Sequence, residues 1–359
     1  MKFEQIPNID KAWDSVSIET LSPSTFSWIH NGCAYQVLLN RLLNVHPSCQ
    51  LPPHKNTTIG TIVHKIYELT TKGQLCSFAE MRDKWEEMIK IEEDKLAIKY
   101  PMLKSINLND YDKRNKAIKY ALWITKNRRP KVEESSNVSV LSEKYLDCKE
   151  IGLKGVADKL VIANGEISII DYKSGQVFDK DGNIKKEYIT QLHLYAAMCE
   201  HLQLGKISRL ALIDINGEEI FVEYDQELKR KLCNNVSATI EHLNDIILRR
   251  AFEEVVKVDS SICSKCDCRH ICQYRLENEE DYYHTIVGTV IEQPSTNMYV
   301  VTDDSSINRY ISGLDQYSID NASGYFKKRL VFINVVKSSP NSEDSAYKVC
   351  DSSIIFEQL

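Results

Sequence analysis

Apolar and polar residues alternate on both sides of Asn164-Gly165, and this pattern predicts a β-hairpin. An Asn-Gly pair is typical of a two-residue type I′ turn, which fixes the register of the two strands. Ala163 then pairs with Glu166, so Asp158 is expected directly opposite Asp171. The alternation also predicts that both aspartates share one face with four aliphatic residues: Leu160, Ile162, Ile167 and Ile169.

The two opposed carboxylates predict a metal site. Directly opposed side chains have Cβ atoms about 4.5–5.5 Å apart, and like charges so placed destabilise a sheet. Burial on an apolar face adds to this cost, and a divalent cation would offset it. Lys173 lies two residues beyond Asp171, so it is expected on the same side, within reach of the same water or phosphate. The alternative is an ordinary surface hairpin with an unrelated Asp-Lys pair.

Periodicity along the rest of the chain predicts an α/β protein with a mixed central sheet. A helix that bears Cys33 follows Ser22-Pro23-Ser24, and strands, a hairpin and a helix alternate from about residue 138 to 222. Two charged, amphipathic segments fall within an all-helical insertion at about residues 74–135. The further predicted helices span residues 58–72, 78–98, 111–128, 187–202 and 225–252.

After residue 282 the pattern changes to short β-branched runs separated by Ser, Asn, Asp and Gly. Such runs predict a small all-β barrel, and an OB-fold is the preferred architecture. We therefore expect two domains, residues 1–282 and residues 283–359, with the barrel binding either nucleic acid or another protein. The predicted strands span residues 287–291, 298–302, 310–314, 330–336 and 347–349.

Composition narrows the class of protein. A net charge of −6 argues against a protein that coats nucleic acid through bulk positive charge. Eleven cysteines without a secretory signal at residues 1–5 favour reduced thiols and metal ligation, so a cytoplasmic location is expected. No apolar run approaches the roughly 20 residues that cross a bilayer, so no membrane association is expected.

Four cysteines crowd into ten residues: Cys263, Cys266, Cys268 and Cys272. Four thiolates suit a tetrahedral zinc ion, and a segment of this length can close around one, with His270 as a substitute for one cysteine. Spacing alone does not separate zinc from an iron-sulfur cluster, which also takes four thiolates.

Gly155-x-x-Asp158 followed by Asp171-x-Lys173 resembles the motif of the PD-(D/E)xK nuclease superfamily. Gln191-x-x-x-Tyr195 and the segment around His64 resemble two further motifs of its RecB-like branch. The resemblance implies a restriction-endonuclease-like core that binds Mg²⁺ or Mn²⁺.

The resemblance also implies roles for single residues. Asp158 and Asp171, with His64 and the backbone carbonyl of Tyr172, would bind the metal. Lys173 would orient the attacking water, and Gln191 and Tyr195 would support Lys173 and the substrate backbone. Glu143 matches a position where the family often carries an acid on the preceding strand.

Cys33 stands far upstream of Cys263-x-x-Cys266 and Cys272, and this arrangement resembles the iron-sulfur staple of AddB-type and CRISPR-associated RecB-like nucleases. On that resemblance these four cysteines would hold a 4Fe-4S cluster, with Cys268 left over. Zinc remains the alternative.

A basic run without acids extends from residue 113 to 131 and predicts a local contact with the DNA backbone. A solvated helix face is the ordinary explanation for such a run. Tyr120 and Trp123 lie within it and could stack on bases or pack in the core. The predicted DNA-binding residues are Lys113, Arg114, Lys116, Lys119, Lys126, Arg128, Arg129 and Lys131.

These features together predict a metal-dependent DNA nuclease for DNA that is single-stranded or has free ends. It would be exonucleolytic or single-strand-directed, and would act in DNA processing, repair or prokaryotic defence. The alternatives are a subunit that acts only within a helicase or defence complex, and a catalytically silent DNA-binding scaffold.

Overall fold

The predicted hairpin forms in the computed structural model. Strands β3 (Leu153–Ala163) and β4 (Glu166–Lys173) pair with Ala163 opposite Glu166. Both turn residues adopt positive φ, 53° at Asn164 and 80° at Gly165, as a type I′ turn requires. The ladder of paired residues ends at Lys159 and Ile170, one pair before the two aspartates.

The structure describes most of the chain, and all structural statements below concern this part. The described residues are 2–3, 6, 8–46, 49–99, 108–127, 138–264, 266–277, 283–295, 297–314, 326–338, 346–350 and 353–358.

The hairpin lies at the centre of a five-stranded mixed sheet in the order β2-β3-β4-β5-β6. The other three strands are β2 (Val138–Cys148), β5 (Lys206–Asp214) and β6 (Glu219–Val222). Only β4 and β5 run parallel, and α7 (Lys186–His201) connects them in sequence. The α/β class and the mixed sheet predicted from the sequence are therefore confirmed.

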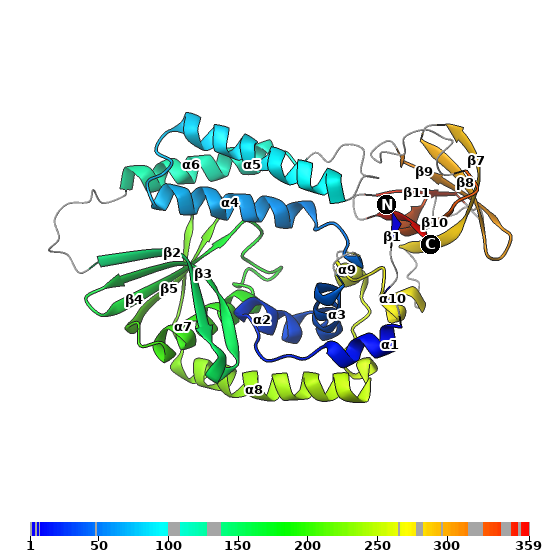
Figure 1. The fold of residues 1–359 in the computed structure, drawn as a ribbon. Helices are drawn as coiled ribbons and strands as arrows, with labels where there is room; N and C mark the ends of the chain where they lie inside the picture. The colour runs from blue at the N-terminus through cyan, green and yellow to red at the C-terminus, as the bar shows by residue number, and fades with distance from the viewer. Residues whose placement is uncertain are drawn as a thin grey trace.

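Helices cover both faces of this sheet (Figure 1). One face packs on α7, α2 (Pro23–Asn31) and α8 (Gln226–Arg249) around the largest hydrophobic core. The other face packs on α4 (Lys55–Thr71), α5 (Phe78–Lys99) and α6 (Tyr111–Asn127) around a second core. Leu160, Ile167 and Ile169 are buried in the first core with Ile162 packed against it, so the four aliphatic residues share a face as predicted.

The segment that bears Cys33 differs from the single predicted helix. Helix α2 ends at Asn31, Gly32 follows, and α3 (Ala34–Val45) begins after Cys33. Further along, short helices surround the cysteine-rich segment: α1 (Ile9–Ala12), η1 (Trp13–Ser15), η4 (Phe252–Glu254), α9 (Ser260–Cys263) and α10 (Gln273–Glu277).

The C-terminal strands close into a five-stranded barrel in the order β7-β8-β9-β11-β10, with β10 pairing back to β7. Strands β9 and β11 are parallel and the other neighbours are antiparallel, which is the OB-like arrangement predicted. The strands are β7 (His284–Ser295), β8 (Met298–Asp303), β9 (Asn308–Ser312), β10 (Arg329–Lys337) and β11 (Ala346–Lys348).

Two strands of this sheet were not predicted. Strand β12 (Ile354–Gln358) pairs with β10, and β1 (Lys2–Phe3) pairs in parallel with β12, so the two ends of the chain lie side by side (Figure 1). Val331, Ile333 and Phe356 of the barrel are buried in the same core as α2 and α7. The barrel therefore packs directly on the rest of the protein. None of the helices in the described ranges is long and apolar enough to span a membrane.

Helix α4 carries a buried acid that predicts a pH-dependent contribution to stability. The Glu68 carboxylate is 9% exposed and forms ion pairs of 2.5 Å with Lys65 and Lys72. Burial opposes ionisation of Glu68, but hydrogen bonds from the two lysines outweigh it and lower the pKa of the carboxyl group. A pKa below the unfolded value stabilises the fold above about pH 4.5, and this stabilisation is lost as pH falls through the folded pKa.

We expect Glu68→Gln to lower the free energy of unfolding by about 1 kcal/mol at neutral pH, because the lysines are half exposed and the pair is partly screened. Urea unfolding at neutral pH and at about pH 3 measures the difference, which should vanish in acid. An equal loss of stability at both pH values would contradict the ion-pair explanation.

Candidate active site

Three side chains from different elements meet where the edge strand β2 pairs with β3. His64 of α4, Glu143 of β2 and Asp158 of β3 each offer one ligand atom, and these atoms lie within 4.8 Å of one another. His64 Nδ1 lies 3.3 Å from Asp158 Oδ1. Two carboxylates and one imidazole form a ligand set that suits Mn²⁺ and, through the oxygens, Mg²⁺.

An unusual backbone conformation lies at this group. Ser142 pairs with Lys159 and Lys144 pairs with Ala157, but Glu143 between them adopts φ 51° within strand β2. A left-handed conformation at a residue other than glycine costs of the order of 1–3 kcal/mol and is typical of functional sites. The left-handed conformation distorts the pairing of β2 with β3 at the point where Glu143 approaches His64 and Asp158.

Asp171 lies in a second, adjoining network on the α7 side of the sheet. Lys173 Nζ is 2.6 Å from Asp171 Oδ2, as an ion pair without hydrogen-bond geometry, and it donates a hydrogen bond of 2.8 Å to Gln191 Oε1. Gln191 Nε2 in turn donates to Asp171 Oδ1 at 3.1 Å. Tyr195 Oη donates to the Val156 carbonyl at 2.6 Å and ties α7 to β3.

The two aspartates are therefore neighbours that face opposite sides of the sheet, so the prediction that both share the face of the four aliphatic residues is wrong for Asp158. The Asp158 carboxylate accepts a hydrogen bond of 2.7 Å from the Tyr172 backbone N–H and faces His64 of α4. The Asp171 carboxylate faces Gln191 of α7. Of the four predicted metal ligands, the structure groups His64 and Asp158 within 4.8 Å, and it adds Glu143.

The glycine of the Gly155-x-x-Asp158 motif has a packing role. A Cβ atom at Gly155 would lie 3.1 Å from Pro23 Cδ and 3.4 Å from Tyr195 Oη. A side chain at this position would therefore press on Pro23 of α2 and require a small shift of the neighbouring helix. Gly155 thus helps to position the strand that carries Asp158.

The electrostatics of the site favour a bound cation. Burial raises the pKa of Asp171, with the neighbouring Asp158 adding to the effect and Lys173 opposing it. Burial and the charge of Asp158 also raise the pKa of Glu143. Burial opposes protonation of His64, yet the Asp158 carboxylate outweighs it and raises the pKa of His64 to about 9. The raised pKa values of Asp171, Glu143 and His64 all favour bound positive charge at this site, which a metal ion would supply.

Sequence reasoning did not identify Tyr188, which lies one turn before Gln191 on α7. Lys173 Nζ lies 4.3 Å from the centre of the Tyr188 ring. A cation at that distance over an aromatic face is held by a cation–π interaction. The only sequence signal is the three-residue spacing between Tyr188 and Gln191, which places both on one helix face.

The predicted DNA-binding run lies mostly on α6. Arg114 is 2.6 Å from Glu86, and Lys116 is 2.8 Å from Asp112, so these two cations are paired with acids. Lys119 and Lys126 are exposed beside Trp123, whose ring is 56% exposed and stacks on Tyr120 at 5.6 Å. Lys113 bonds Asn56, and Arg128, Arg129 and Lys131 lie outside the described residues.

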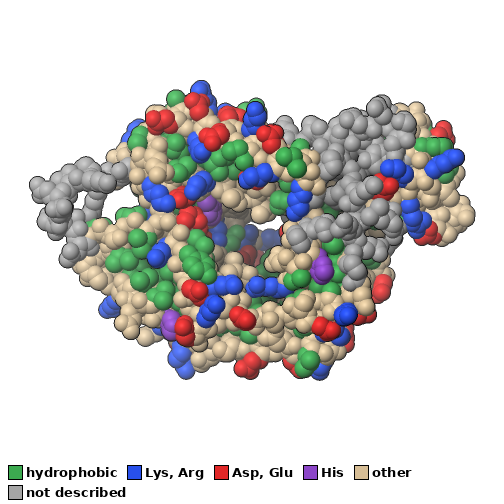
Figure 2. Space-filling view, in the orientation of Figure 1, with side chains coloured by type: hydrophobic (Ala, Val, Ile, Leu, Met, Phe, Trp, Pro, Cys, Tyr) green, Lys and Arg blue, Asp and Glu red, His purple; other side chains and the backbone are tan. Residues whose placement is uncertain are grey.

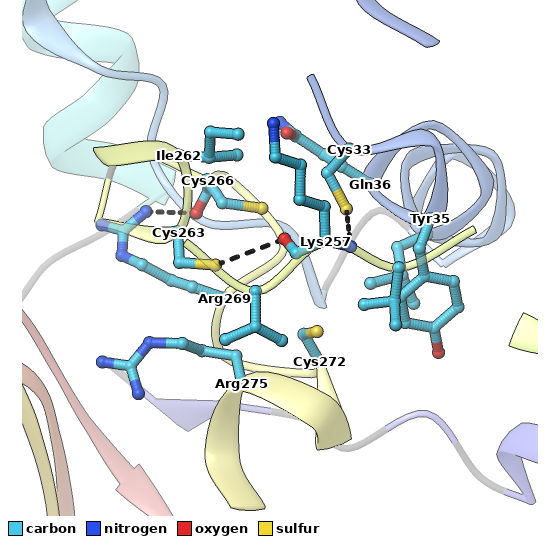
Figure 3. A pocket seen from close by; sticks show the side chains of 13 residues that line it. Cys33, Tyr35, Gln36, Lys257, Ile262, Cys263, Cys266, Arg269, Cys272 and Arg275 are labelled. Carbon is cyan, nitrogen blue, oxygen red and sulfur yellow. Dashed lines mark hydrogen bonds between the residues drawn. The ribbon is translucent and has the colours of Figure 1, made fainter. Parts of the chain in front are cut away.

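The predicted cluster cysteines meet in one pocket. Cys33, Cys263, Cys266 and Cys272 all line it, and their sulfur atoms face a common space (Figure 3). Three of these sulfurs accept backbone N–H groups, from Lys257 to Cys33, from Asp259 to Cys263 and from Cys268 to Cys266. Hydrogen bonds from the backbone to sulfur are a usual feature of iron-sulfur ligands.

Two residues of the local zinc alternative, Cys268 and His270, have other partners, although the Cys268 thiol also contacts Cys266. Cys268 Sγ contacts Asn40 Oδ1 at 3.0 Å, and His270 Nε2 contacts the Cys49 carbonyl at 2.7 Å. Zinc–sulfur bonds of about 2.3 Å would bring four tetrahedral sulfurs to within about 4 Å of one another. Within the described part of the chain, no three cysteine sulfurs lie within 4.8 Å of one another.

Comparison with known proteins identifies the class to which this fold and site belong. The family model of the PD-(D/E)XK nuclease superfamily matches residues 20–273, which is more than half of the chain. The chain therefore belongs to the PD-(D/E)XK nuclease superfamily, as the motifs indicated. The match includes every residue of both networks described above.

A solved structure from Eubacterium rectale, named as a "Putative exonuclease", is similar to this chain with a TM-score of 0.40 and 12% identity. The alignment covers 75% of this chain and 94% of that chain. No curated protein matches the sequence.

Removal of the Tyr188 ring tests its contact with Lys173. We expect Tyr188→Leu to lower kcat for phosphodiester cleavage about tenfold with little change in KM, because the lysine loses one of its supports. Tyr188→Phe keeps the ring and should retain the parent rate. Steady-state kinetics on an oligonucleotide measure both, and a Phe variant as slow as the Leu variant would exclude the ring contact.

Proposed function

We propose that this protein is a metal-dependent DNA nuclease that hydrolyses phosphodiester bonds. The observation that carries the proposal is the meeting of His64, Glu143 and Asp158 directly beside the Lys173–Asp171–Gln191 network. A silent scaffold would have no need to keep a strained Glu143 and three crowded carboxyl groups, because each costs stability.

The residues divide into a metal group and a lysine network. His64, Glu143 and Asp158 would hold Mg²⁺ or Mn²⁺, with Asp171 close enough for its charge to raise the pKa of His64. Such an ion, when bound, lowers the pKa of a coordinated water and neutralises charge on the phosphate.

The lysine network supplies the second part of the chemistry. Gln191, Asp171 and the Tyr188 ring fix the position of Lys173 Nζ beside the Asp171 carboxylate. An ammonium held in this way orients the attacking water by hydrogen bonding and stabilises the negative charge that develops on phosphate oxygens. Asp158 holds β4 in place through the Tyr172 N–H, so the metal group and the lysine keep a fixed spacing.

Cleavage assays test this assignment. Asp171→Ala and Lys173→Ala should each lower kcat at least about 100-fold on plasmid and single-stranded DNA with Mn²⁺, because charge stabilisation at the phosphate is lost. Lys180→Ala is the matched control, since Lys180 is an exposed lysine on the loop that follows β4. Degradation at the parent rate by both site variants would defeat the assignment.

We also propose that Cys33, Cys263, Cys266 and Cys272 hold a 4Fe-4S cluster, which would link α3 to the segment after α8. The common pocket and the backbone N–H donors to sulfur support this assignment. Burial raises the pKa of Cys272 to about 12, so its thiolate needs a bound cation.

Anaerobically purified protein should therefore be brown, with an absorption band at about 400 nm that reductant bleaches. Cys33→Ser should lose iron, whereas Cys268→Ser, its matched control, should keep it, because Cys268 faces Asn40. Colourless protein with stoichiometric zinc, or loss of metal in the Cys268→Ser variant alone, would overturn the cluster.

A further inference from the structure

An exposed apolar pair adjoins the metal group on the same two strands. Tyr145 of β2 and Val156 of β3 are direct partners in the ladder, and they are 55% and 40% exposed. They lie two residues along from Glu143 and Asp158, a step of about 7 Å in a strand. Tyr145 and Val156 together are called the platform below.

The side chains of both strands change faces at Glu143 and Asp158. Leu141 and Leu146 both contact the first core although they lie five residues apart, and Ala157 and Leu160 both lie in it although they lie three apart. In a regular strand, residues separated by an odd number face opposite sides. The alternation therefore shifts by one residue at the metal group, where Glu143 adopts its left-handed conformation.

This shift places the platform on the face that α4 covers. Tyr145 precedes Leu146 and Val156 precedes Ala157, so both point away from the first core. The second core, under α4, lies on that same side of the sheet, and α4 supplies His64. Tyr145 and Val156 remain exposed on this face, and Figure 2 shows hydrophobic side chains on the strands below α4, beside a hollow in the surface.

We propose that the platform is a stacking site for the nucleobase adjacent to the phosphate that is cleaved. The inference rests on the proposed function and specifies its substrate. The flat face of a base can stack on a tyrosine ring, and Val156 extends the contact surface beside it. The platform lies only about 7 Å along the strands from the metal group, so a base stacked on it would be close to the phosphate at the metal.

The same geometry selects an unpaired strand. Bases inside a duplex are stacked on each other and present only their edges, whereas an unpaired base offers a free face. An exposed aromatic at this position therefore favours single-stranded DNA or a frayed end over intact duplex. Isolated exposed apolar residues are common on protein surfaces, so the placement beside the metal group is what carries the inference.

Binding of a fluorescent single-stranded oligonucleotide in Ca²⁺ tests the platform without cleavage. Tyr145→Ala should weaken binding roughly 5- to 100-fold, because one base loses its stacking partner. Tyr145→Phe should bind within about twofold of the parent. Phe221→Ala is the matched control, because Phe221 is 62% exposed on β6 at the opposite edge of the same sheet.

An abasic scan locates the contact. In the parent, removal of one base at a single position next to the cleaved phosphate should weaken binding by the same factor as Tyr145→Ala. The abasic substrate should cause no further loss in the Tyr145→Ala variant, since the contact is already absent. If the abasic site and Tyr145→Ala together weaken binding by the product of their separate factors, the base does not stack directly on Tyr145.

The outcomes separate the platform from the nuclease assignment. A Tyr145→Ala variant that melts like the parent and binds as tightly would overturn the platform, even if Asp171→Ala abolishes cleavage. A parent that binds the oligonucleotide through Tyr145 but never cleaves it would support base stacking on Tyr145 and refute the nuclease. A parent that binds no single-stranded DNA would overturn the platform.

Discussion

Negative charge gathered on strands β2, β3 and β4 of the five-stranded sheet determines how the rest of the site is arranged. Glu143, Asp158 and Asp171 are partly or fully buried and close together, and the charges of His64 and Lys173 relieve part of their mutual repulsion. Such a group is costly to fold unless protons or a cation neutralise it. The helices around the sheet are placed so that one, α4, supplies the histidine and another, α7, supplies the partners of the lysine.

The strain at Glu143 and the change of faces along β2 and β3 are two aspects of one distortion. A left-handed residue within a strand shifts the alternation, so the chain can bury Leu141 and Leu146 in one core while Tyr145 remains exposed. The same distortion brings Glu143 to His64 and Asp158. Local strain of this kind is tolerated because the long ladder between β2 and β3 and two packed cores hold the backbone on either side.

Much of the fold follows from local chemistry in the sequence. The Asn164-Gly165 turn fixed the hairpin register, and helical periodicity placed the predicted helices from residue 58 onward within three residues of their observed bounds. Pairing between the chain ends, through β1 and β12, had no local signal, because it depends on strands more than 350 residues apart.

The ligand group could be predicted only in part. The positive φ of Glu143 depends on tertiary packing. The pairing of β3 with β4 ends one pair before Asp158 and Asp171, and beyond that point the two aspartates contact different partners.

The central claim is that Glu143, Asp158 and His64 bind one divalent ion, and calorimetric titration with Mn²⁺ tests it most directly. The account predicts that Glu143→Gln weakens Mn²⁺ binding at least about tenfold, since a charged oxygen ligand is lost. It also predicts that binding to the parent releases a proton, seen as a dependence of the heat on the buffer. Parent-like Mn²⁺ affinity in both Glu143→Gln and Asp158→Asn would contradict the account.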